Sequence, residues 1–356
     1  MKMTLREYRL QLRNPFTTSH GTDEIQTTLI VELRDGEFGG YGEAPDNFYF
    51  NVSTPAVRRR LEEVRGLIEG TPWERPEELW ENLKKPLAGC SFGLCAVDQA
   101  AHDLWGKRLG EPVHRLWGLS PEKAPFSDYT IGIDPVETMV ERLKQFPGWP
   151  IYKIKLGTKD DINIVRELRK HTDAVFRVDA NTAWTAAETI QNSRAMKGLG
   201  VEYIEQPLKA HQWEDSKRVY LESELPIIAD ESCVLEEDVL RCVGYFHGIN
   251  IKLSKCGGLT PGRRMALQAR ELGLKIMIGC MTETTVGISA ITQLLPLLDY
   301  ADTDGALLLK DDIARGVRVE KGKVIYPCEN GCGVTLTHEP DAFLNKTRPD
   351  KCVVGA

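Results

Sequence analysis

The chain of 356 residues lacks the long hydrophobic runs, basic stripes and paired cysteine motifs that mark several large classes of protein. Its longest apolar stretches fall well short of the ~20 residues that a membrane span requires. A formal net charge of −7 argues against a nucleic-acid-binding surface. The first residues, MKMTLREYRLQLRN, alternate and carry charges throughout, which indicates a first strand and not a signal peptide. We therefore expect a cytoplasmic protein without membrane or nucleic-acid partners.

Cysteine and histidine patterns exclude further classes. The nine cysteines form an odd set without a secretory signal, so we expect reduced thiols that mostly serve packing. Cys328 and Cys332, in CENGCG, have the only spacing that suggests a metal, but no second pair completes a zinc site. The dispersed histidines assemble no Ser-His-Asp or Cys-His nucleophile. A GxGxxG turn is also missing after the early strands, which argues against a doubly wound dinucleotide-binding sheet.

What the sequence does contain is a change in the spacing of its apolar residues near residue 125. Residues 1–55 alternate like β-strands with a turn at the DG pair 35–36, and residues 55–118 have helical spacing. From there, short apolar strands alternate with helices, which predicts an α/β fold with a (β/α)8-type barrel. We expect an α+β capping domain in residues 1–120 and the barrel in residues 121–315. The C-terminal segment, residues 316–356, should return to the capping domain.

Three of the predicted barrel strands end on a carboxylate: Asp179 in RVDAN, Glu205 in YIEQP and Asp230 in PIIADES. The landmarks Lys155, Asp179, Glu205, Asp230 and Lys252 lie 24, 26, 25 and 22 residues apart, one βα unit for each interval. Barrel enzymes carry their reactive groups at these strand ends, so the carboxylates should converge. Any one of them alone would be read as a helix cap. Three together repel unless a cation lies among them, and oxygen ligands favour Mg²⁺.

Lysines are predicted on both sides of this site. The KIK sequence places Lys153 and Lys155 on one face of a strand, because alternate residues point the same way. Each ammonium lowers the pKa of the other and a metal would lower both, so one lysine can act as a neutral base. Lys252 lies across the barrel, whereas Lys255 is expected in solvent beyond the strand end. A base on each side suits the removal of a proton from one face of a carbon and its return to the other.

As a set, these residues resemble the enolase superfamily, in its muconate lactonizing enzyme-like subgroup. The resemblance covers nearly the whole chain, including KIK, the three strand-end carboxylates and KLSKCGG. It implies that Lys155 and Lys252 are the acid/base residues, that Lys153 is the pKa partner of Lys155, and that a Mg²⁺-stabilised enolate forms after a proton is removed α to a carboxylate. The implied metal ligands are Asp179, Glu205 and Asp230, supported by Asn181 and Glu231.

The DTDG sequence of the last strand narrows the range of expected substrates. Asp302 and Asp304 point the same way, and dipeptide epimerases similarly bind a substrate ammonium with a DxD at this place. We therefore expect an isomerase, a dipeptide epimerase that inverts the α-carbon of the C-terminal residue by two-base 1,1-proton transfer. Glu283, Phe50 and Thr130 are further expected substrate-binding residues, and the protein is expected to be a homo-oligomer. An N-acylamino-acid racemase, a muconate-type cycloisomerase or a catalytically silent metal-binding barrel, with DTDG as a mere turn, remain alternatives.

Two loops of the capping domain, FTTSHGTDE (16–24) and EAPDNFYFNVS (43–53), are expected to close over the barrel and contact the substrate side chains. Family members that act on Ala-Glu carry an arginine on the first loop, where this chain has Ser19, His20 and Gly21. Burial of a substrate glutamate side chain without a cationic partner would carry a large desolvation penalty. The loops therefore predict a preference for hydrophobic or, secondarily, cationic dipeptides. Alternatively, the FYF aromatics pack the capping domain and a barrel-loop lysine supplies the missing charge.

Overall fold

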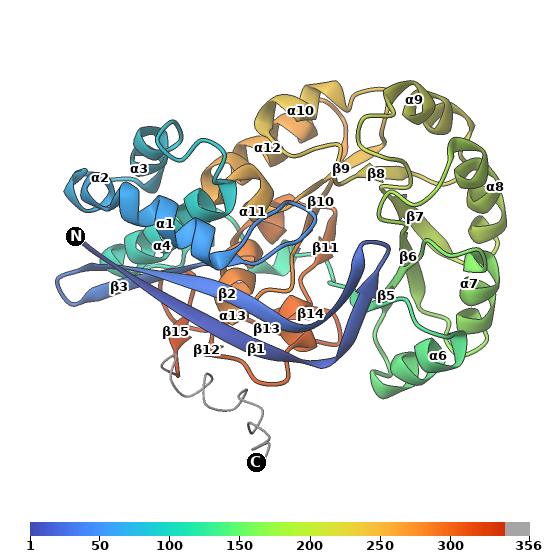
Figure 1. Ribbon diagram of the computed structural model, residues 1–356, viewed down its shortest axis with the longest axis horizontal. Helices are drawn as coiled ribbons and strands as arrows, with labels where there is room; N and C mark the ends of the chain where they lie inside the picture. Colours follow the sequence, from blue (N-terminus) through green and yellow to red (C-terminus); the bar gives the residue numbers. More distant parts are fainter. Residues whose placement is uncertain (339–356) are drawn as a thin grey trace, which may run out of the picture.

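The computed structural model describes residues 1–338, which form a capping part and a barrel part (Figure 1). The strands of the capping part are β1 (Lys2–Thr18), β2 (Gly21–Asp35) and β3 (Phe38–Pro45). Its helices are α1 (Thr54–Glu63), α2 (Arg65–Gly70), α3 (Pro76–Leu83), α4 (Ser91–Leu109) and α5 (Val113–Leu116), followed by the 3-10 helix η1 (Pro121–Lys123).

The barrel part contains a sheet of eight parallel strands in the order β11-β10-β9-β8-β7-β6-β5-β4, and a bridge between Ser127 and Ala301 joins its two edges. The strands are β4 (Tyr129–Ile131), β5 (Ile151–Lys155), β6 (Val175–Asp179), β7 (Val201–Glu205), β8 (Ile227–Ala229), β9 (Gly248–Ile251), β10 (Lys275–Gly279) and β11 (Tyr300–Asp302). The helices are α6 (Val136–Gln145), α7 (Asp161–Arg169), α8 (Ala186–Lys197), α9 (Trp213–Glu222), α10 (Glu236–Arg241), α11 (Leu253–Cys256), α12 (Leu259–Glu271), α13 (Thr285–Ile291), η2 (Thr292–Leu297) and η3 (Gly305–Leu308). This arrangement confirms the predicted barrel with its α+β cap.

The interior of the barrel follows the two-residue period of its strands. Tyr203, Ile228 and Met277 form a small apolar cluster apart from the main core, which lies between the strands and the surrounding helices. Because alternate side chains share a face, Glu205 and Asp230 point into the barrel one layer above Tyr203 and Ile228. The same alternation that builds the core therefore carries polar side chains to the C-terminal ends of the strands.

The antiparallel sheet of the capping part packs closely on helix α4. Strands β2 and β3 are joined by a turn at Gly36 and Glu37, where the glycine adopts a φ of 59° as a tight hairpin requires. Gly42 on β3 faces Ala96, and a Cβ at Gly42 would lie 2.0 Å from the Ala96 carbonyl oxygen. The absence of a side chain at Gly42 thus lets the backbones of sheet and helix approach each other.

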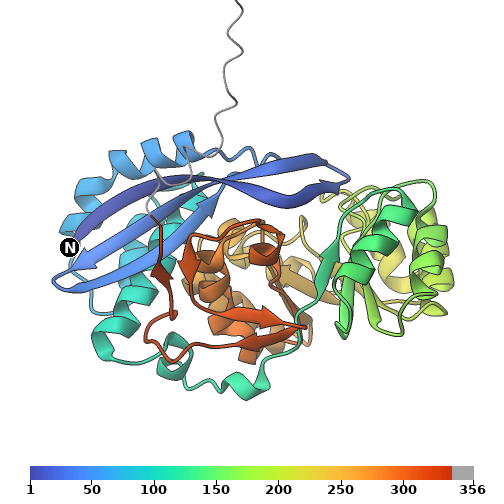
Figure 2. The same ribbon diagram turned by 90° about the horizontal axis from the view of Figure 1, so that it is seen from below.

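The β1–β2 hairpin extends beyond the capping part and reaches the barrel (Figures 1 and 2). Its far end pairs Thr17 with Thr22 and Thr18 with Gly21. The Thr17 carbonyl there accepts a hydrogen bond of 2.9 Å from the backbone N–H of Ile133, which follows β4. The tip of the hairpin is therefore attached to the barrel mouth.

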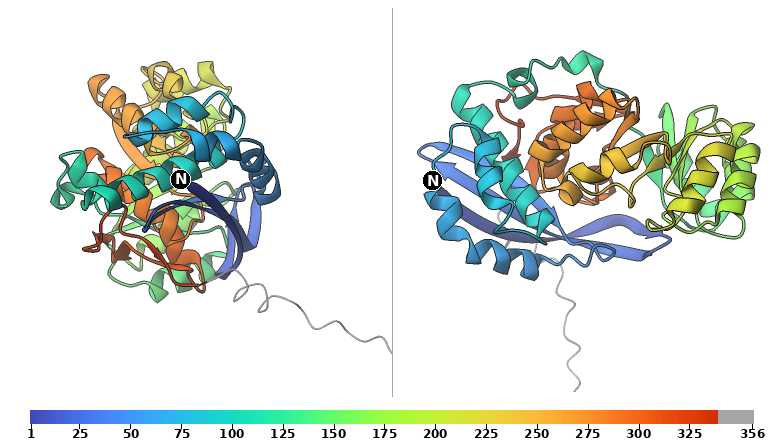
Figure 3. Two further views of the ribbon diagram at one scale, coloured as in Figure 1. Left: turned by 90° about the vertical axis from the view of Figure 1, so that its left-hand side faces the viewer. Right: turned by 90° about the horizontal axis from the view of Figure 1, so that it is seen from above.

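Two buried carboxylates of the capping part dock on helix starts of the barrel. Glu43, at the end of β3, accepts bonds from the backbone N–H groups of Thr284, at 3.0 Å, and Gly287, at 2.9 Å, in the first turn of α13. Asp98, on α4, accepts from the N–H of Thr260 at 2.8 Å, in the first turn of α12. Each satisfies N–H groups that a helix start leaves without partners. Figure 3 shows α12 and α13 (orange) between α1–α4 and the other barrel helices.

The chain after the barrel lies against α4 and α5. Its short strands are β12 (Ala314–Arg315), β13 (Arg318–Glu320), β14 (Lys323–Ile325) and β15 (Thr335–Leu336). The N–H of Cys332 donates to Asp103 on α4 at 2.8 Å, and the Gly331 carbonyl accepts from Val113 on α5 at 2.9 Å. The domain boundaries at residues 120 and 315 stay a prediction, and residues 339–356 of the expected C-terminal segment lie outside the described residues. None of the described helices has the length and apolarity needed to cross a membrane.

Candidate active site

Three carboxylates form a buried layer at the C-terminal ends of neighbouring strands. Asp179 ends β6, Glu205 ends β7, and Asp230 directly follows β8. Asp179 and Glu205 are paired across the two strands, so both lie at the same level of the barrel. Their exposed fractions are 0%, 0% and 2%. The structure thus brings together the three residues that the strand-end pattern singled out.

Two lysines flank this layer from opposite sides. Lys155 ends β5, and its Nζ lies 2.7 Å from Oδ2 of Asp179. Lys252 follows β9, and its Nζ lies 2.8 Å from Oδ2 of Asp230. Strands β6, β7 and β8 separate the two lysines in the sheet. A group held over the carboxylate layer would therefore have one ammonium or amine on each side.

Lys153 lies one layer deeper and contacts several acids at once. Its Nζ lies 2.7 Å from Oδ2 of Asp302, 2.8 Å from Oε2 of Glu205 and 3.2 Å from Oδ2 of Asp179. Burial disfavours its ammonium form, but these three carboxylates outweigh burial and raise the pKa of Lys153 above its usual value. We expected the lysine pair to lower its own pKa values, and at Lys153 the surrounding acids have the opposite effect.

The charges of the carboxylate layer are uneven. Burial raises the pKa of Asp179, but Lys155 and Lys153 outweigh it and bring that pKa to about 2. At Glu205, burial and then the charge of Asp179 dominate and raise the pKa to about 7. The central carboxylate therefore has less cationic compensation than its neighbours. This is the charge pattern of a site with room for another positive charge.

The donor set fits a hard divalent cation. All three carboxylates offer oxygen, the donor that Mg²⁺ prefers. Oε2 of Glu205 is buried and accepts no hydrogen bond, although the Lys153 ammonium lies 2.8 Å away. One oxygen of each carboxylate contacts a lysine ammonium, so a cation bound to all three would replace some of these contacts.

Lys255 is not the solvent-exposed residue expected from the sequence, and this expectation was wrong. It is 1% exposed, and its Nζ donates to Oδ1 and the carbonyl of Asp230 at 2.5 and 2.6 Å. Further bonds go to the carbonyl oxygens of Cys233, at 3.0 Å, and Asn250, at 3.2 Å. The short helix α11 turns the chain back after Lys252, so Lys255 points into the barrel wall. There it holds Asp230 from behind.

The DTDG acids lie at the end of the last barrel strand. Asp302 ends β11, and Oδ2 of Asp304 accepts a bond of 2.6 Å from the backbone N–H of Thr130. Asp302 is 5% exposed and Asp304 2%. Burial and then the charge of Asp302 raise the pKa of Asp304 to about 7. All three residues line the same cavity as Lys155 and Lys252.

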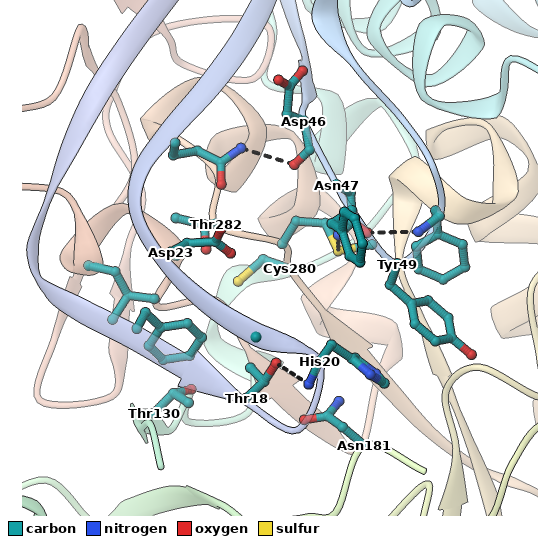
Figure 4. Close-up of a pocket in the computed structure, with 18 of the residues that line it drawn as sticks. Thr18, His20, Asp23, Asp46, Asn47, Tyr49, Thr130, Asn181, Cys280 and Thr282 are labelled. Carbon is teal, nitrogen blue, oxygen red and sulfur yellow. Dashed lines mark hydrogen bonds between the residues drawn. The ribbon is translucent and has the colours of Figure 1, made fainter. Parts of the chain in front are cut away.

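The cavity above these groups has a volume of about 580 Å³ and lies between the barrel mouth and the two capping loops. The tip of the β1–β2 hairpin closes one side, where Oγ of Ser19 donates to the Asn181 carbonyl at 2.7 Å. The rings of His20 and Tyr49 stack with their centres 4.4 Å apart. Nε2 of His20 lies 3.6 Å from Oε1 of Glu231. Figure 4 shows His20, Tyr49 and Asn181 together at this side of the cavity.

Asn181 and Glu231 line the cavity beside the carboxylate layer. The Asn181 N–H donates to Oδ1 of Asp179 at 2.9 Å, and its side-chain amide lies 3.5 Å from Oε1 of Glu231. The hairpin tip therefore contacts Asn181, whose N–H holds Asp179, and Glu231 beside it, and not only the outer rim of the barrel.

Two of the expected substrate-binding residues, Phe50 and Glu283, differ in whether their side chains reach the cavity. Phe50 lines the cavity and packs edge-on against Tyr49, with ring centres 5.0 Å apart. Glu283 is buried behind the cavity wall, where its Oε1 accepts the N–H of Met281 at 2.9 Å. Burial and then the charge of Glu43 raise the pKa of Glu283 to about 8. Glu283 thus shapes the loop after β10 from behind and does not face the cavity.

Sequence reasoning missed two residues of this region besides Lys255. Arg177 is buried one layer below Asp179, where its Nη1 donates to Oδ2 of Asp128 at 3.0 Å. The alternation in RVDAN contained this signal, because Arg177 and Asp179 share a strand face. Cys280, assigned only to packing, lines the cavity next to Asp302.

Comparison with known proteins places this geometry in a family. Residues 136–340 match the family model "Enolase C-terminal domain-like", and residues 1–118 match "Mandelate racemase / muconate lactonizing enzyme, N-terminal domain". The L-Ala-D/L-amino acid epimerase of Flavobacterium johnsoniae is 54% identical over 94% of this chain and 100% of its own length. That of a Maribacter species is 50% identical over 94% and 99%. The dipeptide epimerase of Enterococcus faecalis, solved with Mg and L-Leu-L-Tyr, is 29% identical with a TM-score of 0.87 over 94% of this chain and 99% of that one.

Proposed function

Because the chain belongs to the mandelate racemase/muconate lactonizing enzyme family, with its enolase-like C-terminal domain, we propose that it is a Mg²⁺-dependent dipeptide epimerase. Such an enzyme inverts the α-carbon of the C-terminal residue by removing a proton from one face and returning one to the other. The observation that carries the proposal is the placement of Lys155 and Lys252 on opposite flanks of a buried carboxylate layer.

The two flanking lysines are the proposed acid/base pair. Nζ of Lys155 takes the α-proton from one face while the ammonium of Lys252 donates a proton to the other, and the roles reverse for the opposite enantiomer. Lys153 is proposed to remain charged, because Asp302 and Glu205 raise its pKa. It then supplies fixed positive charge below the reacting carbon, where negative charge develops in the transition state.

Asp179, Glu205 and Asp230 are the proposed ligands of Mg²⁺. When bound there, the ion would polarise the substrate carboxylate as a Lewis acid and would offset the acids, Asp230 foremost, that raise the pKa of Lys252 against the effect of burial. Asn181 and Lys255 hold the outer acids in place through bonds to Asp179 and Asp230. These contacts keep the acidic layer rigid, which preorganised catalysis requires.

Asp302 and Asp304 are proposed to bind the α-ammonium of the dipeptide. The Thr130 N–H orients Asp304, and Lys153 pairs with Asp302, so one oxygen of each acid is already held. An ammonium donates charge-assisted bonds to such a pair, and its charge relieves the repulsion between the acids. We further propose a homo-oligomeric state, which light scattering would test.

An N-acylamino-acid racemase and a cycloisomerase would fit the same scaffold less well. A neutral acyl group or a second substrate carboxylate would face two buried acids without supplying a cation, which costs desolvation energy. A catalytically silent barrel would have no use for a lysine on each side of the acidic layer. If N-acylated amino acids turn over faster than free dipeptides, the racemase replaces the function proposed here.

The preference for particular substrate side chains follows from the residues that line the cavity. Among the described residues that line it there is no arginine, and its lysines are the two proposed bases. Asp23 and Asp46 add negative charge, while Phe48, 90% exposed, presents an aromatic ring at the mouth. We propose that hydrophobic and, secondarily, cationic side chains are preferred over acidic ones. Values of kcat/KM for Ala-Phe, Ala-Leu, Ala-Lys and Ala-Glu test this, and a tenfold advantage of Ala-Glu, about 1.4 kcal/mol, would contradict it.

A screen of L,L- and L,D-dipeptides in D₂O tests the central proposal. Two-base epimerisation exchanges the α-proton with solvent-derived deuterium, so mass spectrometry should detect a gain of one deuteron in the inverted product. The matched control is the Lys252→Ala variant, which should give no inverted product. Inversion without incorporation of deuterium would rule out the proposed proton transfer.

A further inference from the structure

One thiol and two carboxyl groups meet at one point of the cavity wall. Cys280 directly follows β10, and the neighbouring strand β11 ends at Asp302, with Asp304 two residues later. Sγ of Cys280 and one carboxylate oxygen from each acid all lie within 4.8 Å of one another. All three residues line the cavity, so a solute that enters it reaches them. This cluster is separate from the proposed Mg²⁺ ligands at the ends of β6, β7 and β8.

The two acids of this cluster are crowded and only partly compensated. Oδ2 of Asp302 contacts the Lys153 ammonium at 2.7 Å, and Oδ2 of Asp304 accepts from the Thr130 N–H at 2.6 Å. One carboxylate oxygen of each acid lies within 4.8 Å of the other, so each charge disfavours the ionised form of its neighbour, and burial with the charge of Asp302 raises the pKa of Asp304 to about 7. A single cation bound to both acids would relieve this crowding.

The sulfur atom decides which cation suits the cluster. Thiolate is a soft ligand that Zn²⁺ binds readily together with carboxylate, whereas Mg²⁺ requires oxygen donors in octahedral geometry. We propose that Cys280, Asp302 and Asp304 form a second metal site, which takes a thiophilic divalent ion such as Zn²⁺. One thiolate and two carboxylates leave a fourth tetrahedral position for water.

The thiol is inactive until such an ion arrives. Burial, with the charges of Asp302 and Asp304, raises the pKa of the Cys280 thiol well above its ordinary value. Zn²⁺ binding forms the S–Zn bond and releases the thiol proton, and any proton held by the two acids, to water. No oxidant is needed. Affinity should therefore rise with pH, because fewer protons then compete with the metal.

The second site has a regulatory consequence, which rests on the proposed function. Asp302 and Asp304 cannot bind the dipeptide ammonium while they hold Zn²⁺, since the same oxygens would be used. Zn²⁺ should therefore inhibit in competition with the dipeptide, and saturating Mg²⁺ should not relieve this inhibition.

Binding is tested on the full chain with saturating Mg²⁺ and without substrate. Cys328, which is exposed, and Cys352, which lies outside the described residues, are both replaced by serine in the background protein. Zn²⁺ is titrated by calorimetry, and Co²⁺ replaces it to reveal sulfur-to-metal charge-transfer absorption. The test variant is Cys280→Ser, and the matched control is Cys90→Ser, a buried cysteine of the capping part that does not line the cavity.

The background and Cys90→Ser should bind one Zn²⁺ and show the cobalt–sulfur band. Cys280→Ser should lose the band and bind Zn²⁺ at least about tenfold more weakly, because loss of even an outer-shell partner costs that much. Equal binding in Cys280→Ser would overturn the site. In the activity assay, Zn²⁺ should raise the apparent KM for Ala-Phe and leave kcat unchanged, and a fall in kcat alone would overturn the competition. Zn²⁺ binding at Cys280 without any dipeptide turnover would support the site and contradict the proposed function.

Discussion

Replacement of Lys255 by methionine should destabilise the protein strongly, although this residue is not a proposed base. Lys255 is 1% exposed, and its ammonium donates to Oδ1 of Asp230 at 2.5 Å and to the Asp230 carbonyl at 2.6 Å. The carbonyl oxygens of Cys233 and Asn250 accept from it at 3.0 and 3.2 Å. Methionine keeps the length of the side chain but donates nothing, so four acceptor positions lose a donor together.

The size of the expected destabilisation follows from the burial of the Lys255–Asp230 ion pair. Removal of one partner of a buried ion pair costs about 3–5 kcal/mol, because the remaining charge has no compensation. Asp230 keeps its contact with Lys252 at 2.8 Å, which places Lys255→Met near the lower limit. We expect the free energy of unfolding to fall by about 3 kcal/mol.

Urea denaturation followed by circular dichroism and tryptophan fluorescence measures this loss. The matched control is Lys170→Met, because the Lys170 side chain is 61% exposed and pairs with Glu167 at 2.5 Å on the surface. That change should stay within about 0.5 kcal/mol of the wild type. If Lys255→Met is as stable as Lys170→Met, the acceptors around Lys255 find other donors and the reasoning fails.

Three further predictions concern the chemistry. A chelator should abolish turnover and added Mg²⁺ should restore it; full activity of metal-stripped protein would exclude a metal among the strand-end acids. Lys155→Ala and Lys252→Ala should each abolish epimerisation, whereas one of them can still exchange the α-proton of a single enantiomer with D₂O; normal inversion by either would reassign the bases. Asp302→Asn or Asp304→Asn should weaken dipeptide binding by about 1.5–3 kcal/mol in calorimetry, and N-acetylation of the dipeptide should weaken it similarly with the unmodified protein. Unchanged affinity of both variants would remove the acids from the ammonium site.

The barrel and its acidic layer could be predicted because both depend on local periods. A βα unit of about 25 residues and a strand period of two place Asp179 and Glu205 at one level, and neither period needs knowledge of distant contacts. The same reasoning placed Lys153 and Lys155 on one strand face. These parts of the prediction therefore needed only short stretches of sequence.

The positions of the remaining site residues depend on contacts between segments that are distant in the sequence. Lys255 is buried because helix α11 turns it toward Asp230, a reversal that the strand pattern of INIKLSK does not contain. Glu283 faces away from the cavity, at a cap–barrel joint where the Thr284 N–H meets Glu43, 241 residues earlier. Cys280 lies one residue past a strand end, where side-chain direction follows the loop and not the strand period. Sequence periods do not determine such positions.

The docking of Glu43 and Asp98 on the starts of α13 and α12 limits how this enzyme can be recombined with its relatives. A chimera that takes residues 1–120 from another protein must bring an acid to both positions, or two barrel helices begin with unsatisfied N–H groups. Residues 16–24, at the hairpin tip, take no part in these two contacts. Substitutions there can alter the substrate range while the contacts of Glu43 and Asp98 with the barrel stay intact. Libraries that vary the tip should therefore yield folded enzymes far more often than exchanges of the whole cap.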